Sequence, residues 1–125
     1  MAGKKGISGL SKQELDKLHS IRLTMETSYK KHETIPELAR LAGMNETKFK
    51  ESFKALFGLP PFQYFRSLRI AKAKDLLLNT DESVKSIGIE VGYPDWKSFM
   101  RAFKKSVGIT PSSWRKKHVG KPKKD

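Results

Sequence analysis

Residues 35–64 read IPELARLAGMNETKFKESFKALFGLPPFQY, and residues 84–114 read VKSIGIEVGYPDWKSFMRAFKKSVGITPSSW. Both stretches contain a short apolar segment, a glycine, and a second segment with phenylalanines on one side and basic residues on the other. When Leu38 is aligned with Ile87, Gly43 falls on Gly92, and after one inserted residue the later positions also coincide. The matched positions are Phe49, Phe53, Lys54, Gly58, Pro61 and Tyr64 with Phe99, Phe103, Lys104, Gly108, Pro111 and Trp114. A short helix, a glycine turn and an amphipathic second helix, written twice, predict two helix-turn-helix units.

The sequence outside the two units completes an all-α chain. Ser11-x-x-Glu14 and Thr34-x-x-Glu37 are capping boxes, which mark helix starts. Apolar residues recur at spacings of three and four, and no stretch alternates as a strand does. The expected helices cover about 11–31, 34–43, 46–57, 61–79, 84–91, 95–107 and 110–114. We expect tails at 1–10 and 117–125, a domain at 11–116, and helix-turn-helix units at about 35–58 and 84–108.

The long helix between the units is expected to link them. Its inner face is predicted to be Phe65, Leu68, Ala71, Leu76 and Leu77. About 18 residues at roughly 1.5 Å each give a rod of about 27 Å. Successive major-groove faces of B-DNA lie about 34 Å apart. A linker of this size therefore suits two units that read neighbouring grooves.

The charge of the chain points to a polyanionic partner. The 125 residues include 26 Lys and Arg against 13 Asp and Glu, a net charge of +13. The imbalance is also local, because residues 96–124 hold ten basic residues and no acid. Such an excess favours nucleic acid or an acidic membrane surface as partner.

Several other classes of protein are disfavoured. The chain has no cysteine, so disulfides and thiolate metal sites are excluded. His19, His32 and His118 are dispersed, and no carboxylate pair marks a catalytic pocket. No apolar run approaches the roughly 18 residues that span a bilayer, and the start lacks a signal-peptide core. We therefore expect no enzyme activity, no cofactor and no membrane partner, and a cytoplasmic location.

The second helix of each unit is expected to present a polar front. Its phenylalanines must face the core, which turns basic and polar residues outward. Arg101 is the best candidate for a bidentate contact to guanine. Trp96 and Met100 also face outward, either toward thymine methyl groups or toward the C-terminal tail or a partner protein. The lysines expected to neutralise phosphates are Lys48, Lys54, Lys97, Lys104, Lys105, Lys116 and Lys117.

These residues resemble the signature of AraC/XylS-type transcription regulators. The matching order is Gly92-Tyr93-x-Asp95-x-x-Ser98-Phe99-x-Arg101-x-Phe103-Lys104-x-x-x-Gly108-Ile109-Thr110-Pro111-x-x-Trp114-Arg115, preceded by Arg69-x-x-Lys72-Ala73-x-x-Leu76-Leu77. The resemblance covers about residues 11–116. It implies a seven-helix domain with two helix-turn-helix units bridged by a long helix, which bind double-stranded DNA in neighbouring major grooves.

The resemblance also implies individual site residues. Base-reading positions fall on Thr47, Lys50 and Glu51 in the first unit and on Trp96, Lys97, Met100 and Arg101 in the second. Ser98 matches a phosphate-contacting position, and it joins Lys48, Lys54, Lys104 and Lys105, which are expected to contact phosphates because of their charge. No catalytic or metal-binding residue is implied.

Three positions depart from the family pattern. Gly88 replaces a usual alanine, and a helical glycine costs about 0.5–1 kcal/mol. Pro94 replaces a usual serine cap, so Asp95 must cap the sixth helix alone. Glu51 is acidic at a base-facing position, where it either accepts a hydrogen bond from cytosine N4 or repels phosphate.

The resemblance leaves the wider role of the chain open. Most members join this domain to one that senses a small molecule or dimerises, so the chain is either a stand-alone regulator or the C-terminal part of a longer one. Its start just before the first helix favours the second reading. RNA polymerase is a further expected partner, and two reading helices in one chain favour a monomer. The alternative is a protein-interaction module that contacts the transcription machinery and binds DNA without sequence preference.

Overall fold

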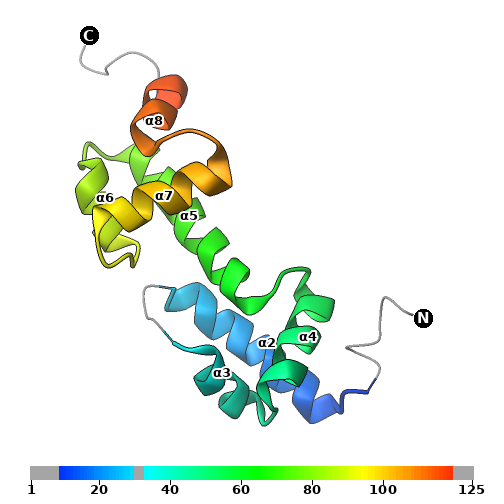
Figure 1. Ribbon diagram of the computed structural model, residues 1–125. Coiled ribbons are helices and arrows are strands. Elements are labelled where there is room, and N and C mark those ends of the chain that lie inside the picture. Colours follow the sequence, from blue (N-terminus) through cyan, green and yellow to red (C-terminus); the bar gives the residue numbers. More distant parts are fainter. Residues whose placement is uncertain (1–8, 30–32, 120–125) are drawn as a thin grey trace. The chain divides into compact units, whose positions relative to one another are not determined.

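The computed structural model describes residues 9–29 and 33–119. These ranges contain seven helices and no strand, which confirms the expected all-α class (Figure 1). The helices are α2 (Lys12–Thr27), α3 (Ile35–Ala42), α4 (Glu46–Phe57), α5 (Pro61–Asn79), α6 (Val84–Glu90), α7 (Trp96–Val107) and α8 (Pro111–Val119). The chain divides into two compact units, unit 1 (Met1–Phe65) and unit 2 (Arg66–Asp125), each with its own core.

Unit 1 is a small helical cluster centred on α3, which packs against both α2 and α4. Its most deeply buried large side chains are Leu18, Met25, Leu38, Phe49 and Phe53. The Phe53 ring meets the edges of Phe57 at 4.7 Å and of Tyr64 at 5.5 Å between ring centroids. Aromatic contacts therefore fix α4 against the first turn of α5.

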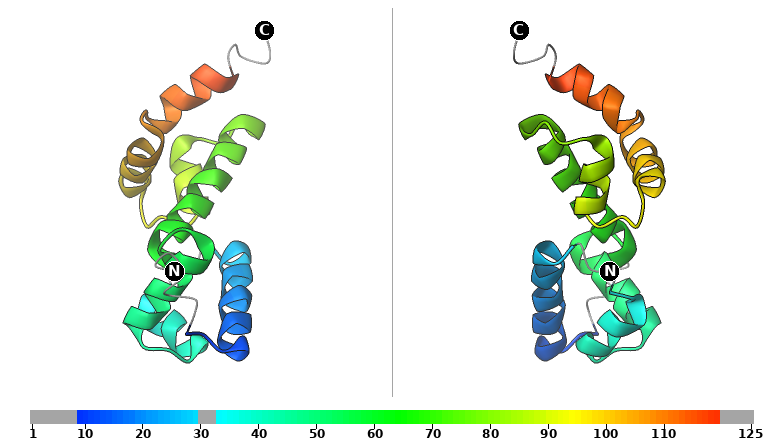
Figure 2. Two further views of the ribbon diagram at one scale, coloured as in Figure 1. Left: turned by 90° about the vertical axis from the view of Figure 1, so that its right-hand side faces the viewer. Right: turned by 90° about the vertical axis from the view of Figure 1, so that its left-hand side faces the viewer.

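Unit 2 is arranged around α7, which contacts both α6 and α8 (Figure 2). Its buried side chains include Ile70, Ala73, Leu77, Ile87, Val91, Phe99, Phe103 and Trp114. The Arg115 guanidinium of α8 donates hydrogen bonds to the carbonyl oxygens of Leu77, at 3.0 Å, and Thr80, at 3.1 Å. These bonds satisfy carbonyls that the C-terminal end of α5 leaves without helical partners.

The inner face of α5 differs in part from the prediction. Phe65, Leu76 and Leu77 are buried as expected, and Leu68 is half-buried. The prediction for Ala71 was wrong, because this residue is exposed. Ile70 and Ala73 are buried in its place, since positions 70, 73 and 77 share one side of the helix while 71 lies about 100° away from 70.

The helix ends follow the expected caps closely. Both capping boxes are present, and Gly43 ends α3 in the left-handed conformation at φ 72°. Two ends differ: α2 stops at Thr27 instead of about Lys31, and α8 continues past Trp114 to Val119.

Lys31 and most of the expected tails, 1–8 and 120–125, lie outside the described residues. Within the described ranges, no helix combines the length and apolar character that a membrane span requires.

Candidate nucleic-acid interface

The front of α4 is exposed because the back of the helix is held in the core of unit 1. The Asn45 side chain caps the helix by accepting a hydrogen bond from the Lys48 backbone N–H at 2.8 Å. Phe49 and Phe53 have no exposed surface. The expected reading residues Thr47, Lys50 and Glu51 are all exposed, as is Lys54.

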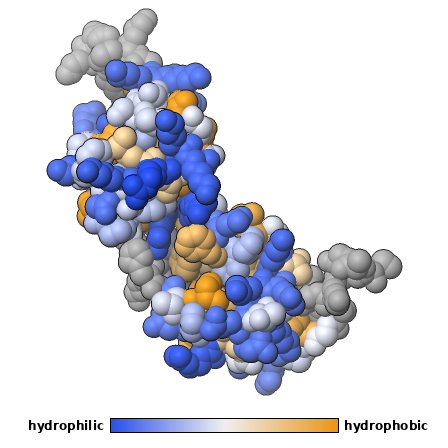
Figure 3. Space-filling view, viewed as in Figure 1, coloured by the Kyte–Doolittle hydropathy of each residue, from blue (hydrophilic) through white to orange (hydrophobic). Residues whose placement is uncertain are grey.

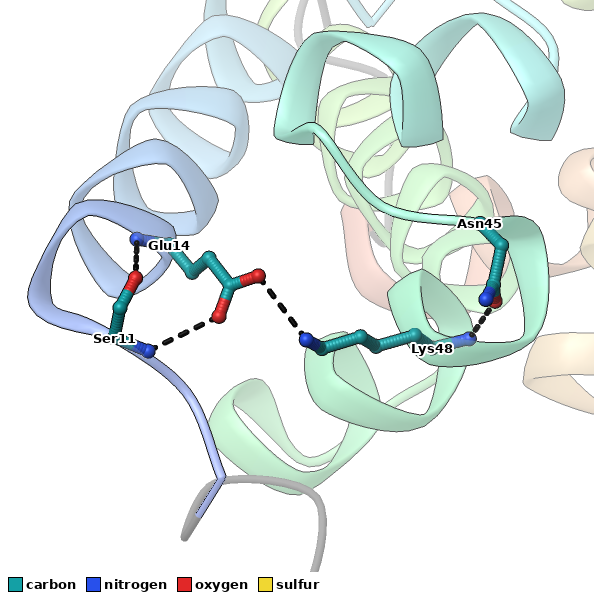
Figure 4. A network of polar contacts seen from close by, with 4 residues as sticks. All are labelled: Ser11, Glu14, Asn45 and Lys48. Atoms are coloured by element: carbon teal, nitrogen blue, oxygen red, sulfur yellow. Dashed lines mark hydrogen bonds and ion pairs between the residues drawn. The ribbon is translucent and has the colours of Figure 1, made fainter.

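Lys48 is the expected phosphate contact that already has a partner in the protein. Its Nζ lies 3.1 Å from Oε2 of Glu14, at the start of α2 (Figure 4). Glu14 also accepts a hydrogen bond from the Ser11 backbone N–H at 3.0 Å. Sequence reasoning missed this pair because the two residues stand 34 positions apart, and only their opposite charges gave a signal.

The front of α7 begins at a cap that Asp95 provides. Its Oδ1 accepts a hydrogen bond from the Ser98 backbone N–H at 2.7 Å, so Asp95 caps the helix behind Pro94 as expected. The pKa of Asp95 is lowered, first by hydrogen bonds from Ser98 and to a smaller extent by the positive charge of Arg101. The carboxylate is therefore stabilised in its charged form at the helix N-terminus.

The expected contact residues of α7 differ in exposure. Lys97, Arg101, Lys104 and Lys105 are exposed, and Trp96 has 37% of its surface exposed. Met100 and Ser98 are half-buried. Met100 therefore lies less far outward than the sequence pattern predicts, because it stands next to the buried Phe99 and one turn before Phe103.

A close helix crossing fixes α7 in unit 2. A Cβ atom placed on Gly88 of α6 would lie 2.8 Å from the Phe99 Cβ atom. Real Cβ atoms do not approach so closely, so the glycine gives α7 room to pack on α6. The sequence indicated only the helix-propensity cost of Gly88, because the facing residue is eleven positions away.

The turn before α7 is held by a second contact. The Arg69 guanidinium of α5 lies over the Tyr93 ring, 5.6 Å from its centroid. Burial lowers the pKa of Arg69 and raises that of Tyr93. A desolvated cation–π contact of this kind stabilises the turn between α6 and α7.

The two fronts differ in charge. The α4 helix carries Lys48, Lys50 and Lys54 together with Glu46 and Glu51, whereas α7 carries four basic residues and no acid. Salt bridges in the described part of the chain include those of Arg22 with Glu26, Lys48 with Glu14 and Lys72 with Asp75, and none of these three involves α7. Hydrophilic side chains cover most of the visible face of each unit (Figure 3).

The described residues contain no cluster suited to a metal ion. No three His, Asp or Glu side chains gather there in a way that would hold a cation. Beside carboxylates such as Glu46 and Glu51, the surface of the two units carries lysine, arginine, amide and hydroxyl groups. Such groups bind phosphates and base edges.

Comparison with known proteins identifies close similarity in sequence and fold. A family model described as a helix-turn-helix domain matches residues 38–117. The HTH-type transcriptional regulator ExsA of Pseudomonas aeruginosa is 33% identical over 106 residues, which cover 85% of this chain and 37% of ExsA. The chain spans about a third of the length of the curated relatives it matches.

Solved structures share the fold. The DNA-binding domain of AdpA, crystallised with a target DNA, superimposes with a TM-score of 0.77 at 22% identity, covering 82% of this chain and 92% of that one. A regulator of Chromobacterium violaceum, described as AraC-type, gives a TM-score of 0.72 at 24% identity over 86% of this chain and 96% of its own. These likenesses show that the seven helices form the same fold.

Proposed function

The chain belongs to the helix-turn-helix family of AraC-type regulators, and on this premise we propose that it is a sequence-specific DNA-binding transcription regulator. The observation that carries the proposal is the repeated construction of α4 and α7. Each helix buries two phenylalanines and exposes a polar or basic front. In the proposal α4 and α7 enter successive major grooves of one duplex.

Base reading is assigned to the residues on the two fronts. In α4 these are Thr47, Lys50 and Glu51, and in α7 they are Trp96, Lys97, Met100 and Arg101. Arg101 has the fork of donors that suits guanine O6 and N7, and its side chain is exposed. The half-buried Met100 would reach a base only through the end of its side chain.

Phosphate binding is assigned to Lys54, Ser98, Lys104 and Lys105. The three lysines are exposed, and Ser98, whose backbone N–H is bound by Asp95, would reach a phosphate through its hydroxyl group. These contacts would fix the position of each unit on the duplex without reading sequence. Lys48 differs from them because Glu14 already binds it.

The proposed DNA-binding domain covers residues 11–116. Since the curated relatives are about three times as long as the matched region, what the whole protein senses is a separate matter from what this domain binds. We propose that this chain binds DNA as a monomer, in the cytoplasm, without enzymatic activity, and that RNA polymerase is its protein partner.

Trp96 supports a second candidate function. A tryptophan with 37% of its surface exposed is also what a protein–protein contact would use. In this alternative the chain is an interaction module for the transcription machinery, and its charge gives DNA affinity without sequence preference.

Salt dependence tests whether the chain binds DNA through its charge, and a comparison of unrelated duplexes then separates the two functions, because non-specific binding is also salt-dependent. The affinity for a fluorescent 30-base-pair duplex would be measured by anisotropy between 50 and 200 mM salt. Contacts to about six to ten phosphates predict a loss of about 10³–10⁵ in affinity over this range. Equal affinity for unrelated duplexes would favour the interaction module, and weak binding with a shallow salt dependence would contradict DNA binding in either function.

A further inference from the structure

Glu14 belongs to α2, yet its carboxylate is bound to the first turn of α4. One oxygen, Oε1, accepts a hydrogen bond from the Ser11 backbone N–H at 3.0 Å. The other, Oε2, lies 3.1 Å from Lys48 Nζ, while Asn45 holds the Lys48 backbone N–H at 2.8 Å (Figure 4). Both oxygens of the carboxylate and both ends of Lys48 are therefore engaged.

This ion pair is better organised than most surface pairs. A typical exposed pair contributes little because two flexible side chains must be fixed in one geometry. Here the capping box already fixes Glu14, and the Glu14 side chain is only 24% exposed against 44% for Lys48. The pKa of Glu14 is lowered, first by the Ser11 backbone hydrogen bond and then by Lys48, so the carboxylate is charged at neutral pH.

The pair changes the charge that α4 presents. With Lys48 neutralised, the remaining charged residues of α4 are Lys50 and Lys54 against Glu46 and Glu51, which cancel. The front of α7 keeps four positive charges. The α4 helix already has the smaller positive excess of the two, and the Glu14 carboxylate on a neighbouring helix removes what remains of it.

We propose that Glu14 limits the DNA affinity of unit 1 by occupying Lys48 in place of a DNA phosphate. This inference rests on the proposed function, because it concerns the same α4 front. Unit 1 then neutralises one phosphate fewer than its lysines allow, and replacing Glu14 releases Lys48 to the duplex backbone.

The test compares Glu14→Gln with Glu37→Gln. Glutamine preserves either capping box, and each change removes one negative charge from unit 1. Glu37 caps α3 through Thr34, with an N···O distance of 2.8 Å, but it makes no salt bridge among the described residues. Because the charge of Arg40 also acts on Glu37, the assignment to Lys48 rests on a double-variant cycle beside this comparison. Lys48→Gln and the double variant Glu14→Gln/Lys48→Gln complete a cycle, and thermal melts verify that each variant is folded.

The readout is the slope of log affinity against log salt on one duplex. Relative to Glu37→Gln, Glu14→Gln is expected to steepen the slope by about 0.9, so the two affinities diverge about 3.5-fold between 50 and 200 mM salt. Lys48→Gln alone should leave the wild-type slope unchanged. The double variant should lack the steeper slope that Glu14→Gln is expected to show.

Three results would overturn the inference while leaving the proposed function intact. They are equal slopes for Glu14→Gln and Glu37→Gln, weaker binding by Glu14→Gln, or a shallower slope for Lys48→Gln in the otherwise wild-type chain. The last would mean that Lys48 leaves Glu14 when DNA binds. Failure of the wild-type protein to bind duplexes in a salt-dependent way would instead overturn the proposed function, and this inference with it.

Discussion

Gly88 shows how a single residue sets the distance between two helices. Replacing it with alanine would put a methyl group 2.8 Å from the Phe99 Cβ atom. This Cβ atom is attached directly to the backbone of α7, so it cannot move aside easily. The gain in helix propensity from alanine is about 0.5–1 kcal/mol, and overpacking of a filled site costs about 1–3 kcal/mol. We expect the clash to dominate.

Gly88→Ala should therefore lower the free energy of unfolding by about 1–2 kcal/mol, measured by urea denaturation. Gly9→Ala is the matched control, because nothing lies within 4 Å of a Cβ atom at that position. A variant as stable as the wild type would show that α6 and α7 can separate without cost.

Asp95 gives the stability of the protein a pH dependence. Its pKa is lowered in the folded state by the Ser98 hydrogen bonds, so the charged carboxylate stabilises the fold. This contribution is complete above the unfolded pKa of about 3.9 and is lost as the pH falls through the lower folded value. Asp95→Asn keeps a capping oxygen but removes the titration.

Melting temperatures between about pH 5 and pH 2 should therefore fall less steeply for Asp95→Asn than for the wild-type protein. Parallel curves for Asp95→Asn and the wild type would contradict the assigned role of the cap.

At this scale the sequence predicted what local pattern determines. The exposure of Lys50 and Arg101 follows from the phenylalanine spacing, and the cap at Asp95 follows from its place before the helix. The Glu14–Lys48 pair and the Gly88–Phe99 contact depend on how helices pack. No local pattern encodes those contacts, so sequence reasoning did not find them.

Helix boundaries were predictable where a cap or a glycine marks them. The bounds of α4 follow from Asn45 and Gly58, and Gly58 adopts φ 89°. The end of α2 carries no such mark, since Tyr29 continues the apolar spacing beyond the last helical residue. The length of α8 was missed because contacts to another part of unit 2 hold it, among them the Arg115 hydrogen bonds to the carbonyl oxygens of Leu77 and Thr80.

Arg115 connects two helices of unit 2, and its loss should be costly. Arg115→Gln removes a guanidinium that donates to Leu77 and Thr80 carbonyls at the end of α5. Hydrogen bonds to charged groups contribute about 1.5–3 kcal/mol, so we expect a loss of about that size in the free energy of unfolding. Lys117→Gln, an exposed position on the same helix, should be neutral. Equal stability of the two variants would show that α8 does not hold α5 through these bonds.

At the scale of the whole molecule, positive charge is divided unequally. By sequence, unit 1 has eleven basic and seven acidic residues, whereas unit 2 has fifteen and six. We therefore expect unit 2 to provide most of the electrostatic affinity for a duplex.

The variant Lys104→Gln tests the contribution of the positive charge of unit 2 to DNA affinity. Lys104→Gln removes one exposed positive charge from α7, and it should weaken binding to every duplex alike. The slope of log affinity against log salt should fall by about 1. A loss confined to particular sequences would instead assign Lys104 to base reading.

We propose that α4 and α7 each read their own block of base pairs. Selection of bound duplexes from a random library tests it most directly, with wild type, Lys50→Ala and Arg101→Ala in parallel. We expect an enriched site of two blocks about one helical turn apart, with Lys50→Ala weakening the sequence preference in one block and Arg101→Ala in the other. A single block, one block blurred by both variants, or salt-sensitive binding that enriches no sequence would contradict it.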